Sequence, residues 1–96
     1  MGIEEILGAK REEILRIAAK HGVTSIRVFG SVARGDAGPD SDVDFLIEAG
    51  SDVPAWFPGG LVADLEDLLG RDVDVVERCA LRSRIGPRVL AEAVAF

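Results

Sequence analysis

The chain has 96 residues, of which 48% are hydrophobic and 29% charged, a size and composition that predict one globular domain over residues 1–96. Seventeen acidic and eleven basic residues give a formal charge of −6, which disfavours direct binding to a nucleic-acid backbone. A single cysteine excludes an internal disulfide, and without a signal-peptide pattern or an apolar run of roughly 20 residues we expect a cytoplasmic protein that does not span a membrane.

The first part of the chain has the pattern of a helix followed by a strand. Apolar residues recur at helical spacing over Ile3–Lys20, which predicts one amphipathic helix. His21 and Gly22 follow, and a glycine that takes the left-handed conformation is typical of a helix end. The β-branched stretch Val23–Phe29 predicts a buried strand that stops at Gly30.

A short polar connection leads from this strand to a second one. Ser31–Arg34 has the length of a single helical turn, and Gly35–Ser41 has the glycine, proline and aspartate content of a surface loop. Asp42–Glu48 then alternates between two sets of positions, one of them fully apolar. This alternation predicts a strand with one face in the core.

The second half of the chain adds a helix, a strand and a further helix. Ala49–Pro58 is irregular, and leucines at helical spacing predict a helix over Leu61–Leu69. Asp72–Val76 predicts a third strand, and Leu81–Phe96 predicts a helix that is interrupted at Gly86. This order of elements indicates an α/β or α+β domain built on a small sheet.

Two aspartates of the second predicted strand point to a metal site. Asp42 and Asp44 are two residues apart, so their side chains leave the strand on the same side. Two like charges on one face repel, and a divalent cation with oxygen ligands such as Mg²⁺ removes that conflict. Asp74 has the same position in the alternation of the third strand. It joins Asp42 and Asp44 if the two strands are neighbours. Asp72 is the competing candidate, although its position suggests a solvent-exposed strand entrance.

The turn ahead of these aspartates has the residues of a phosphate site. Gly30 allows a phosphate to approach the backbone closely, and Ser31 adds a hydroxyl donor at the start of a helical turn. Arg34, one turn later, presents a planar fork that binds phosphate oxygens. The alternative for Arg34 is a surface ion pair with Asp36 or Asp40, which contributes little.

The stretch FGSVARGDAGPDSDVDFLIE, residues 29–48, together with DVDVVE, residues 72–77, resembles a known family. Gly30 and Ser31, ten intervening residues, and then Asp42 and Asp44 are similar to the signature of the DNA polymerase beta-type nucleotidyltransferases. The short chain resembles in particular the minimal nucleotidyltransferases, many of which are antitoxins paired with HEPN-domain ribonuclease toxins. The resemblance implies an α/β (α+β) fold, a small mixed β-sheet flanked by helices on one side.

The same resemblance implies a reaction and a set of site residues. Members of the family hold magnesium, two ions in the active complex, on aspartates that match Asp42 and Asp44. A third aspartate, at a position like Asp74, ligates the metal and assists the nucleophile. ATP is the expected nucleotide donor, and a tyrosine hydroxyl of a HEPN toxin is the acceptor, so that AMP transfer silences the toxin. The residues expected to bind the nucleotide are Gly30, Ser31 and Arg34.

Two other functions stay open at this point. One is a binding antitoxin that occludes its toxin, which the acidic charge and the aromatic segment around Trp56 favour. The other is nucleotide transfer to a small molecule or an RNA end. A neighbouring gene for a small helical protein with an Arg-x4-His motif would favour the toxin pairing. Assembly with a partner or with a second copy is also open.

Three further features have simpler expected roles. Trp56 either joins the core as a satellite or anchors a partner. Cys79 is expected to be packed or inert. A solvated basic face is expected of the arginines in the C-terminal third, with contact to the nucleotide or a partner as the alternative; they are Arg71, Arg78, Arg82, Arg84 and Arg88.

Overall fold

The computed structural model describes residues 1–51, 53, 57–78 and 86–96. Predictions for Trp56, Cys79, Arg82 and Arg84 lie outside these residues. None of the helices in the described ranges is long and apolar enough to cross a membrane. The elements follow one another as α1 (Ile3–Ile6), a 3₁₀ helix (Gly8–Lys10), α2 (Arg11–Lys20), β1 (Val23–Phe29), α3 (Ser31–Arg34), β2 (Val43–Ala49), α4 (Gly59–Leu69), β3 (Val73–Glu77) and α5 (Gly86–Glu92).

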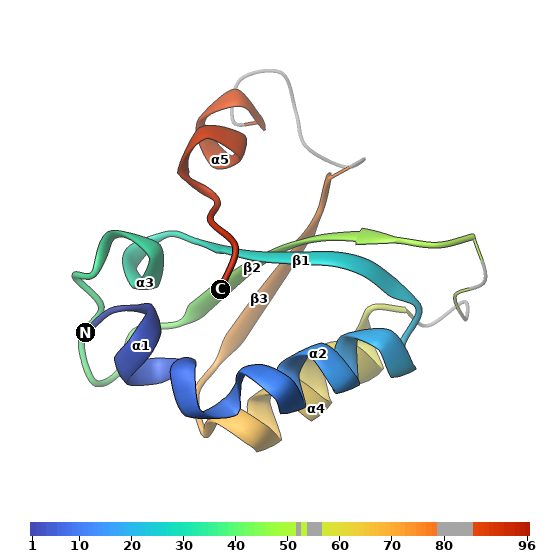
Figure 1. The fold of residues 1–96 in the computed structure, drawn as a ribbon, viewed down its shortest axis with the longest axis horizontal. Helices are drawn as coiled ribbons and strands as arrows, with labels where there is room; N and C mark the ends of the chain where they lie inside the picture. The colour runs from blue at the N-terminus through green and yellow to red at the C-terminus, as the bar shows by residue number, and fades with distance from the viewer. Residues whose placement is uncertain (52, 54–56, 79–85) are drawn as a thin grey trace.

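The three strands form one mixed sheet in the order β1-β2-β3 (Figure 1). β1 runs antiparallel to β2, and β3 runs parallel to β2. A parallel pair needs a crossover connection, and the segment that contains α4 provides it between β2 and β3. The predicted small mixed sheet is therefore confirmed, with β2 in its middle.

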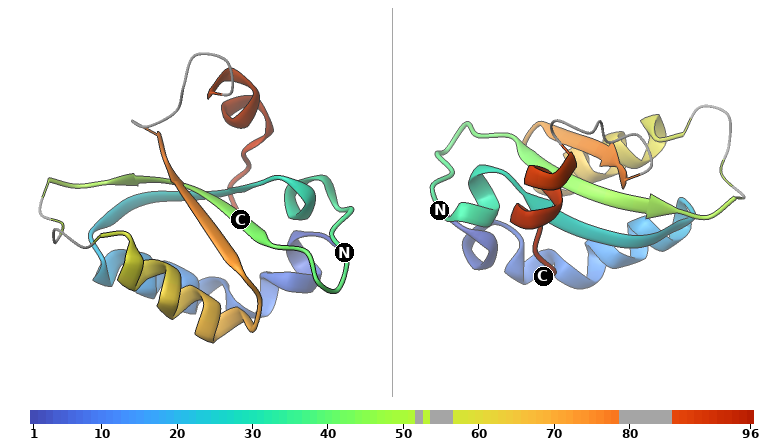
Figure 2. Two further views of the ribbon diagram at one scale, coloured as in Figure 1. Left: turned by 180° about the vertical axis from the view of Figure 1, so that it is seen from behind. Right: turned by 90° about the horizontal axis from the view of Figure 1, so that it is seen from above.

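The core lies between one face of the sheet and the helices α2 and α4, which run side by side (Figures 1 and 2). Val43, Phe45 and Ile47 of β2 are fully buried there, as the alternation of this strand predicts. The two helices contribute buried apolar side chains at helical spacing, namely Ile14, Ala18, Leu61 and Leu65. Asp44 lies on the opposite face of β2.

The C-terminal helix ends earlier than predicted, and it does not join the other long helices. α5 ends at Glu92 and sits on the side of the sheet opposite α2 and α4 (Figure 2), which corrects the expectation of helices on one side only. After α5 the chain is not helical, because Val28 and Val94 exchange backbone hydrogen bonds of 3.0 and 2.9 Å. This pairing satisfies backbone groups at the free edge of β1 that a longer helix would bond internally.

The helix predicted over Ile3–Lys20 is divided into two. α1 stops at Ile6, and a 3₁₀ turn over Gly8–Lys10 precedes α2. Glycine is a poor helix former, so the break falls at a weak point of the pattern. Lys10 Nζ, at the end of this turn, donates a 2.6 Å hydrogen bond to the Leu68 carbonyl in α4.

Strands β2 and β3 are each displaced by one residue from their predicted bounds. β2 begins at Val43 and β3 at Val73, whereas the patterns predicted Asp42 and Asp72, and each strand ends one residue later than predicted. Asp42 and Asp72 are exposed and precede the ladder, since the Val43 N–H already donates to the Asp72 carbonyl over 3.0 Å.

Candidate active site

Strand register brings two predicted site residues, Asp44 and Asp74, side by side at one end of the sheet. Asp44 of β2 pairs with Phe29 of β1 on one side and with Asp74 of β3 on the other. Neighbouring strands are about 5 Å apart, and paired side chains in this register leave the sheet on the same face. Asp74, and not Asp72, is therefore the residue beside Asp44.

Gly30, which follows Phe29 directly, lies against the Asp44 carboxylate. Its φ of 76° is in the left-handed region, and a Cβ at this position would lie 2.2 Å from Oδ2 of Asp44. The backbone conformation favours glycine, and a side chain at this position would also force the Asp44 carboxylate to move. The predicted helical turn over Ser31–Arg34 is confirmed as α3, which starts at this glycine and is closed by Gly35 with a φ of 83°.

The Asp44 carboxylate has an unfavourable electrostatic environment. Partial burial raises its pKa, and the charges of Asp74 and Asp42 raise it further. Arg34 acts in the opposite direction, whereas Glu92 adds to the increase. Burial and three neighbouring carboxylates thus disfavour the ionised form of Asp44.

The donor set at this end of the sheet suits a hard divalent cation. Carboxylate oxygens are the ligands that Mg²⁺ takes, and it commonly uses one or two protein carboxylates together with substrate phosphates and water. Within the described ranges, no three His, Cys, Asp or Glu side chains are arranged to hold a metal ion as a group. Asp42 and Asp44 are the two carboxylates predicted for such an ion, and the charge of Asp42 acts on Asp44.

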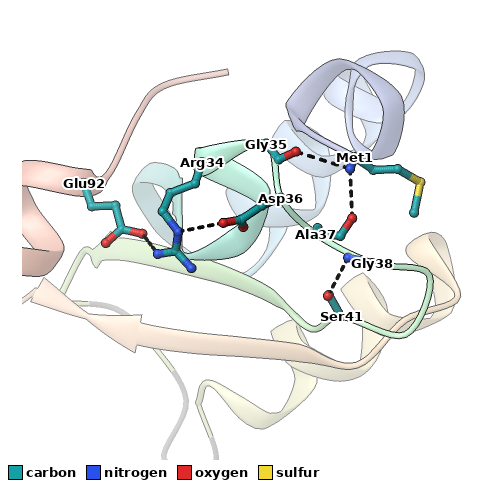
Figure 3. A network of polar contacts seen from close by, with 8 residues as sticks. All are labelled: Met1, Arg34, Gly35, Asp36, Ala37, Gly38, Ser41 and Glu92. Atoms are coloured by element: carbon teal, nitrogen blue, oxygen red, sulfur yellow. Dashed lines mark hydrogen bonds and ion pairs between the residues drawn. The ribbon is translucent and has the colours of Figure 1, made fainter.

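Arg34 is engaged by two carboxylates beside this site (Figure 3). Its Nε lies 3.4 Å from Oδ2 of Asp36, and this is the exposed ion pair that was the alternative role for Arg34. Its Nη1 bonds to Glu92 of α5. These contacts raise the pKa of Arg34, with the hydrogen bond to Asp36 as the largest cause. The guanidinium therefore lies between α3 and α5 and contributes a positive charge close to Asp44.

Two polar residues near the site were not found from the sequence. Glu92 lies 58 residues from Arg34 in the chain, and no local pattern indicates this contact. Arg71, expected on a solvated basic face, is partly buried and donates to the carbonyls of Gly38 and Ser41, which corrects that expectation. Arg78 matches the expectation better, since it is exposed and lies 3.3 Å from Glu48.

A separate carboxylate contact occurs on the side of the sheet that α2 and α4 cover. His21 follows α2, as predicted, and its Nε2 lies 2.7 Å from Oδ2 of Asp64 in α4. Lys20 Nζ is 3.6 Å from the same oxygen. The hydrogen bond with His21, followed by the charges of Lys20 and His21, lowers the pKa of Asp64. This contact joins α2 to α4 and lies away from the residues around Asp44.

A three-stranded mixed sheet with carboxylates and a glycine turn at one end is the architecture expected of a minimal nucleotidyltransferase. Residues 11–94 match the family described as nucleotidyltransferase domain. The chain belongs to this family, and the prediction of a nucleotidyltransferase is confirmed.

Individual proteins agree with this assignment. A protein adenylyltransferase named MntA, from Thermococcus cleftensis, is 42% identical over 93 residues, which cover 96% of this chain and 90% of the relative. A solved structure described as a candidate minimal nucleotidyltransferase is 42% identical and has a TM-score of 0.85, with 100% of this chain and 97% of the other covered. A toxin–antitoxin crystallised with AMP-PNP shares the fold, with a TM-score of 0.76 at 21% identity over 88% of this chain and 70% of the other.

Proposed function

We propose that the chain transfers AMP from ATP to a tyrosine hydroxyl of a HEPN ribonuclease toxin and so neutralises the toxin. The observation that carries the proposal is the pairing of Asp44 with Asp74 beside the Gly30 turn. Membership of the nucleotidyltransferase family supports the transfer of a nucleotide. The relative named a protein adenylyltransferase supports a protein acceptor, and the fold neighbour described as a toxin–antitoxin supports a toxin as that protein.

In the proposed reaction, the acceptor oxygen forms a bond to the α-phosphorus of ATP. The bond from that phosphorus to the oxygen bridging to the β-phosphate breaks, and pyrophosphate leaves with the electron pair. Asp74 accepts the proton of the acceptor hydroxyl. Its side chain is exposed, so the acceptor can reach it, and it is paired with Asp44 in the register of β2 and β3. Gly30 and Ser31 donate hydrogen bonds to the oxygens of the leaving pyrophosphate, and Arg34 neutralises part of its charge.

Asp42 and Asp44 are the proposed ligands of Mg²⁺, and with two ions bound Asp74 becomes a ligand as well. When bound, Mg²⁺ neutralises the negative charge that develops on the reacting phosphate oxygens. Burial and, after it, the charges of Asp74 and Asp42 raise the pKa of Asp44. The carboxylate charges support this role, since a cation between them would remove their repulsion.

Intact-mass measurement of the partner tests this proposal. The chain is co-expressed with the product of the adjacent gene, as wild type and as the variant Asp42→Ala/Asp44→Ala. Glu12→Ala/Glu13→Ala, which removes two exposed carboxylates of α2, is the matched control. We expect the partner to gain one or more AMP units with wild type and with the control, and none with the aspartate variant. Circular dichroism and co-purification establish that each variant folds and binds.

The other outcomes separate the competing functions. A partner that is unmodified but bound and inhibited would contradict AMP transfer and favour neutralisation by occlusion. A modified partner with the Asp42→Ala/Asp44→Ala variant would remove these aspartates from the reaction. Nucleotide incorporation into RNA or a small molecule, with the partner unchanged, would assign a different acceptor to the same site.

A further inference from the structure

Asp42 is exposed and lies one residue ahead of β2, yet the peptide groups on both of its sides are held by hydrogen bonds. On one side, the Ser41 carbonyl accepts a 3.2 Å hydrogen bond from Nη1 of Arg71. On the other side, the Val43 N–H donates a 3.0 Å hydrogen bond to the Asp72 carbonyl. Both partners, Arg71 and Asp72, belong to the turn between α4 and β3.

Arg71 also holds the loop that leads to Asp42. The same Nη1 donates to the Gly38 carbonyl over 2.9 Å, and within the loop the Gly38 N–H donates to Ser41 Oγ over 2.7 Å (Figure 3). One guanidinium nitrogen carries two N–H groups in a rigid planar arrangement, so it can bind two carbonyls at once. Residues 38–41 are thereby tied to a side chain that lies 30 or more residues away in the sequence.

The turn that carries Arg71 also sets the start of β3. The Val73 N–H donates a 3.1 Å hydrogen bond to Oε2 of Glu66 in α4, and Asp74 follows in the strand. Hydrogen bonds at this turn therefore hold the backbone on both sides of Asp42 and directly before Asp74, two of the three aspartates at this end of the sheet. Ligands that are held in place by such outer contacts bind a metal ion more tightly, because less freedom is lost on binding.

We propose that Arg71 is a positioning residue that holds Asp42 for divalent-cation binding, an inference that rests on the proposed metal-dependent transfer. Arg71 acts through the carbonyls of Gly38 and Ser41, which occupy its Nη1, and contacts neither the cation nor the nucleotide. Without this side chain, the loop end that carries Asp42 loses one of its two contacts with the α4–β3 turn, the one through the Ser41 carbonyl. The ladder hydrogen bond of Val43 is retained, so the strands stay paired while the aspartate moves more freely.

Cation binding, measured separately from activity, tests the inference. Mn²⁺ is titrated into wild type, Arg71→Ala, Arg71→Lys and Arg16→Ala in the presence of AMP-PNP, with free Mn²⁺ read by electron paramagnetic resonance. Arg16 is the matched control, since it is exposed on α2 and forms a local ion pair with Glu12. We expect the Kd for Mn²⁺ to rise about 10-fold or more in Arg71→Ala, the size of effect typical of outer contacts at metal sites. Arg71→Lys should recover part of the affinity, and Arg16→Ala should match wild type.

A double-mutant comparison separates positioning from a general loss of stability. If Arg71 acts through Asp42, Asp42→Ala/Arg71→Ala should bind Mn²⁺ no more weakly than Asp42→Ala alone. Additive losses would overturn the inference, and so would an Arg71→Ala variant that melts at a lower temperature but binds Mn²⁺ like wild type. Should Arg71→Ala not fold, Arg71→Lys and Arg71→Gln decide the question by the same comparison.

Failure of the inference can be told apart from failure of the proposed function. Wild type that binds Mn²⁺ through Asp44 but is insensitive to Arg71 would overturn the positioning role alone. Wild type whose Mn²⁺ binding does not change in Asp44→Asn would overturn the proposed metal site, and the role of Arg71 with it.

Discussion

Asp44 and Asp64 are both aspartates, but they lie on opposite sides of the sheet and their carboxylates have opposite electrostatic surroundings. Asp64 lies beside His21 and Lys20, and its pKa is lowered. Asp44 is partly buried beside Asp74 and Asp42, and its pKa is raised. The first carboxylate has the partners that its charge requires. The second is partly buried among carboxylates that repel it, and the charge of Arg34 offsets only part of this effect.

This difference indicates what each carboxylate does for the protein. A carboxylate with cationic partners contributes to folding, because its interactions favour the ionised form that exists at neutral pH. A carboxylate held among like charges works against folding, and proteins tolerate such groups mainly where function needs them. The comparison therefore separates a contact that joins two helices from a group for which we propose a bound cation.

The largest expected effect is that of Asp44→Asn. The substitution keeps the shape of the side chain and removes the charge, so we expect AMP transfer to fall by about 10²- to 10³-fold or more. The same change should raise the Tm at pH 7 without divalent cations by about 2 to 5 °C, because the repulsion from Asp74 and Asp42 is lost. Transfer kinetics and calorimetry on one preparation measure both effects.

The sign of the pH dependence provides the control for Asp44→Asn. A raised folded pKa means that the contribution of Asp44 to stability is fully present below its unfolded pKa and is lost as pH rises through the folded pKa. The stability gained by the variant should therefore be largest near neutral pH and shrink as pH falls through the folded pKa. A variant that is less stable than wild type at pH 7 would contradict the crowding of these carboxylates.

Asp64→Asn should have the opposite profile. The loss of the contacts with His21 and Lys20 should lower the Tm at pH 7 by up to about 4 °C and leave kcat and KM for transfer unchanged. A lowered folded pKa means stability that is present above the unfolded pKa and lost as pH falls through the folded pKa. The difference from wild type should thus disappear at low pH. A fall in AMP transfer without a fall in Tm would contradict the purely structural role of Asp64.

The smallest expected effect is that of Glu92→Gln. Glu92 bonds to Arg34 and its charge raises the pKa of Asp44, so it competes with a triphosphate for the same guanidinium. We expect KM for ATP to fall about twofold to fivefold, the range for an exposed ion pair, with kcat little changed. Asp36→Asn is the matched variant for the other partner of Arg34. An increased KM would show that Glu92 orients Arg34 instead of competing for it.

Local sequence patterns were sufficient for much of the fold and for part of the site. The alternation of side chains along the second strand placed Asp44 on the face away from the core. The glycine before Ser31 marked the turn that lies against the Asp44 carboxylate. Helical and strand patterns also indicated most elements, because each depends on residues close together in the chain. They failed at Gly8, where the first helix is broken, and after Glu92, where Val94 pairs with β1.

The sequence by itself determined the turn at Gly30, the paired aspartates and the order of elements, since these depend on spacing and on the conformational freedom of single residues. Only the tertiary structure decided that Asp74 stands beside Asp44, that Glu92 reaches Arg34 and that Arg71 holds the loop before Asp42. These contacts join segments 30 to 58 residues apart, and they follow from strand order and helix packing, which the whole core determines together.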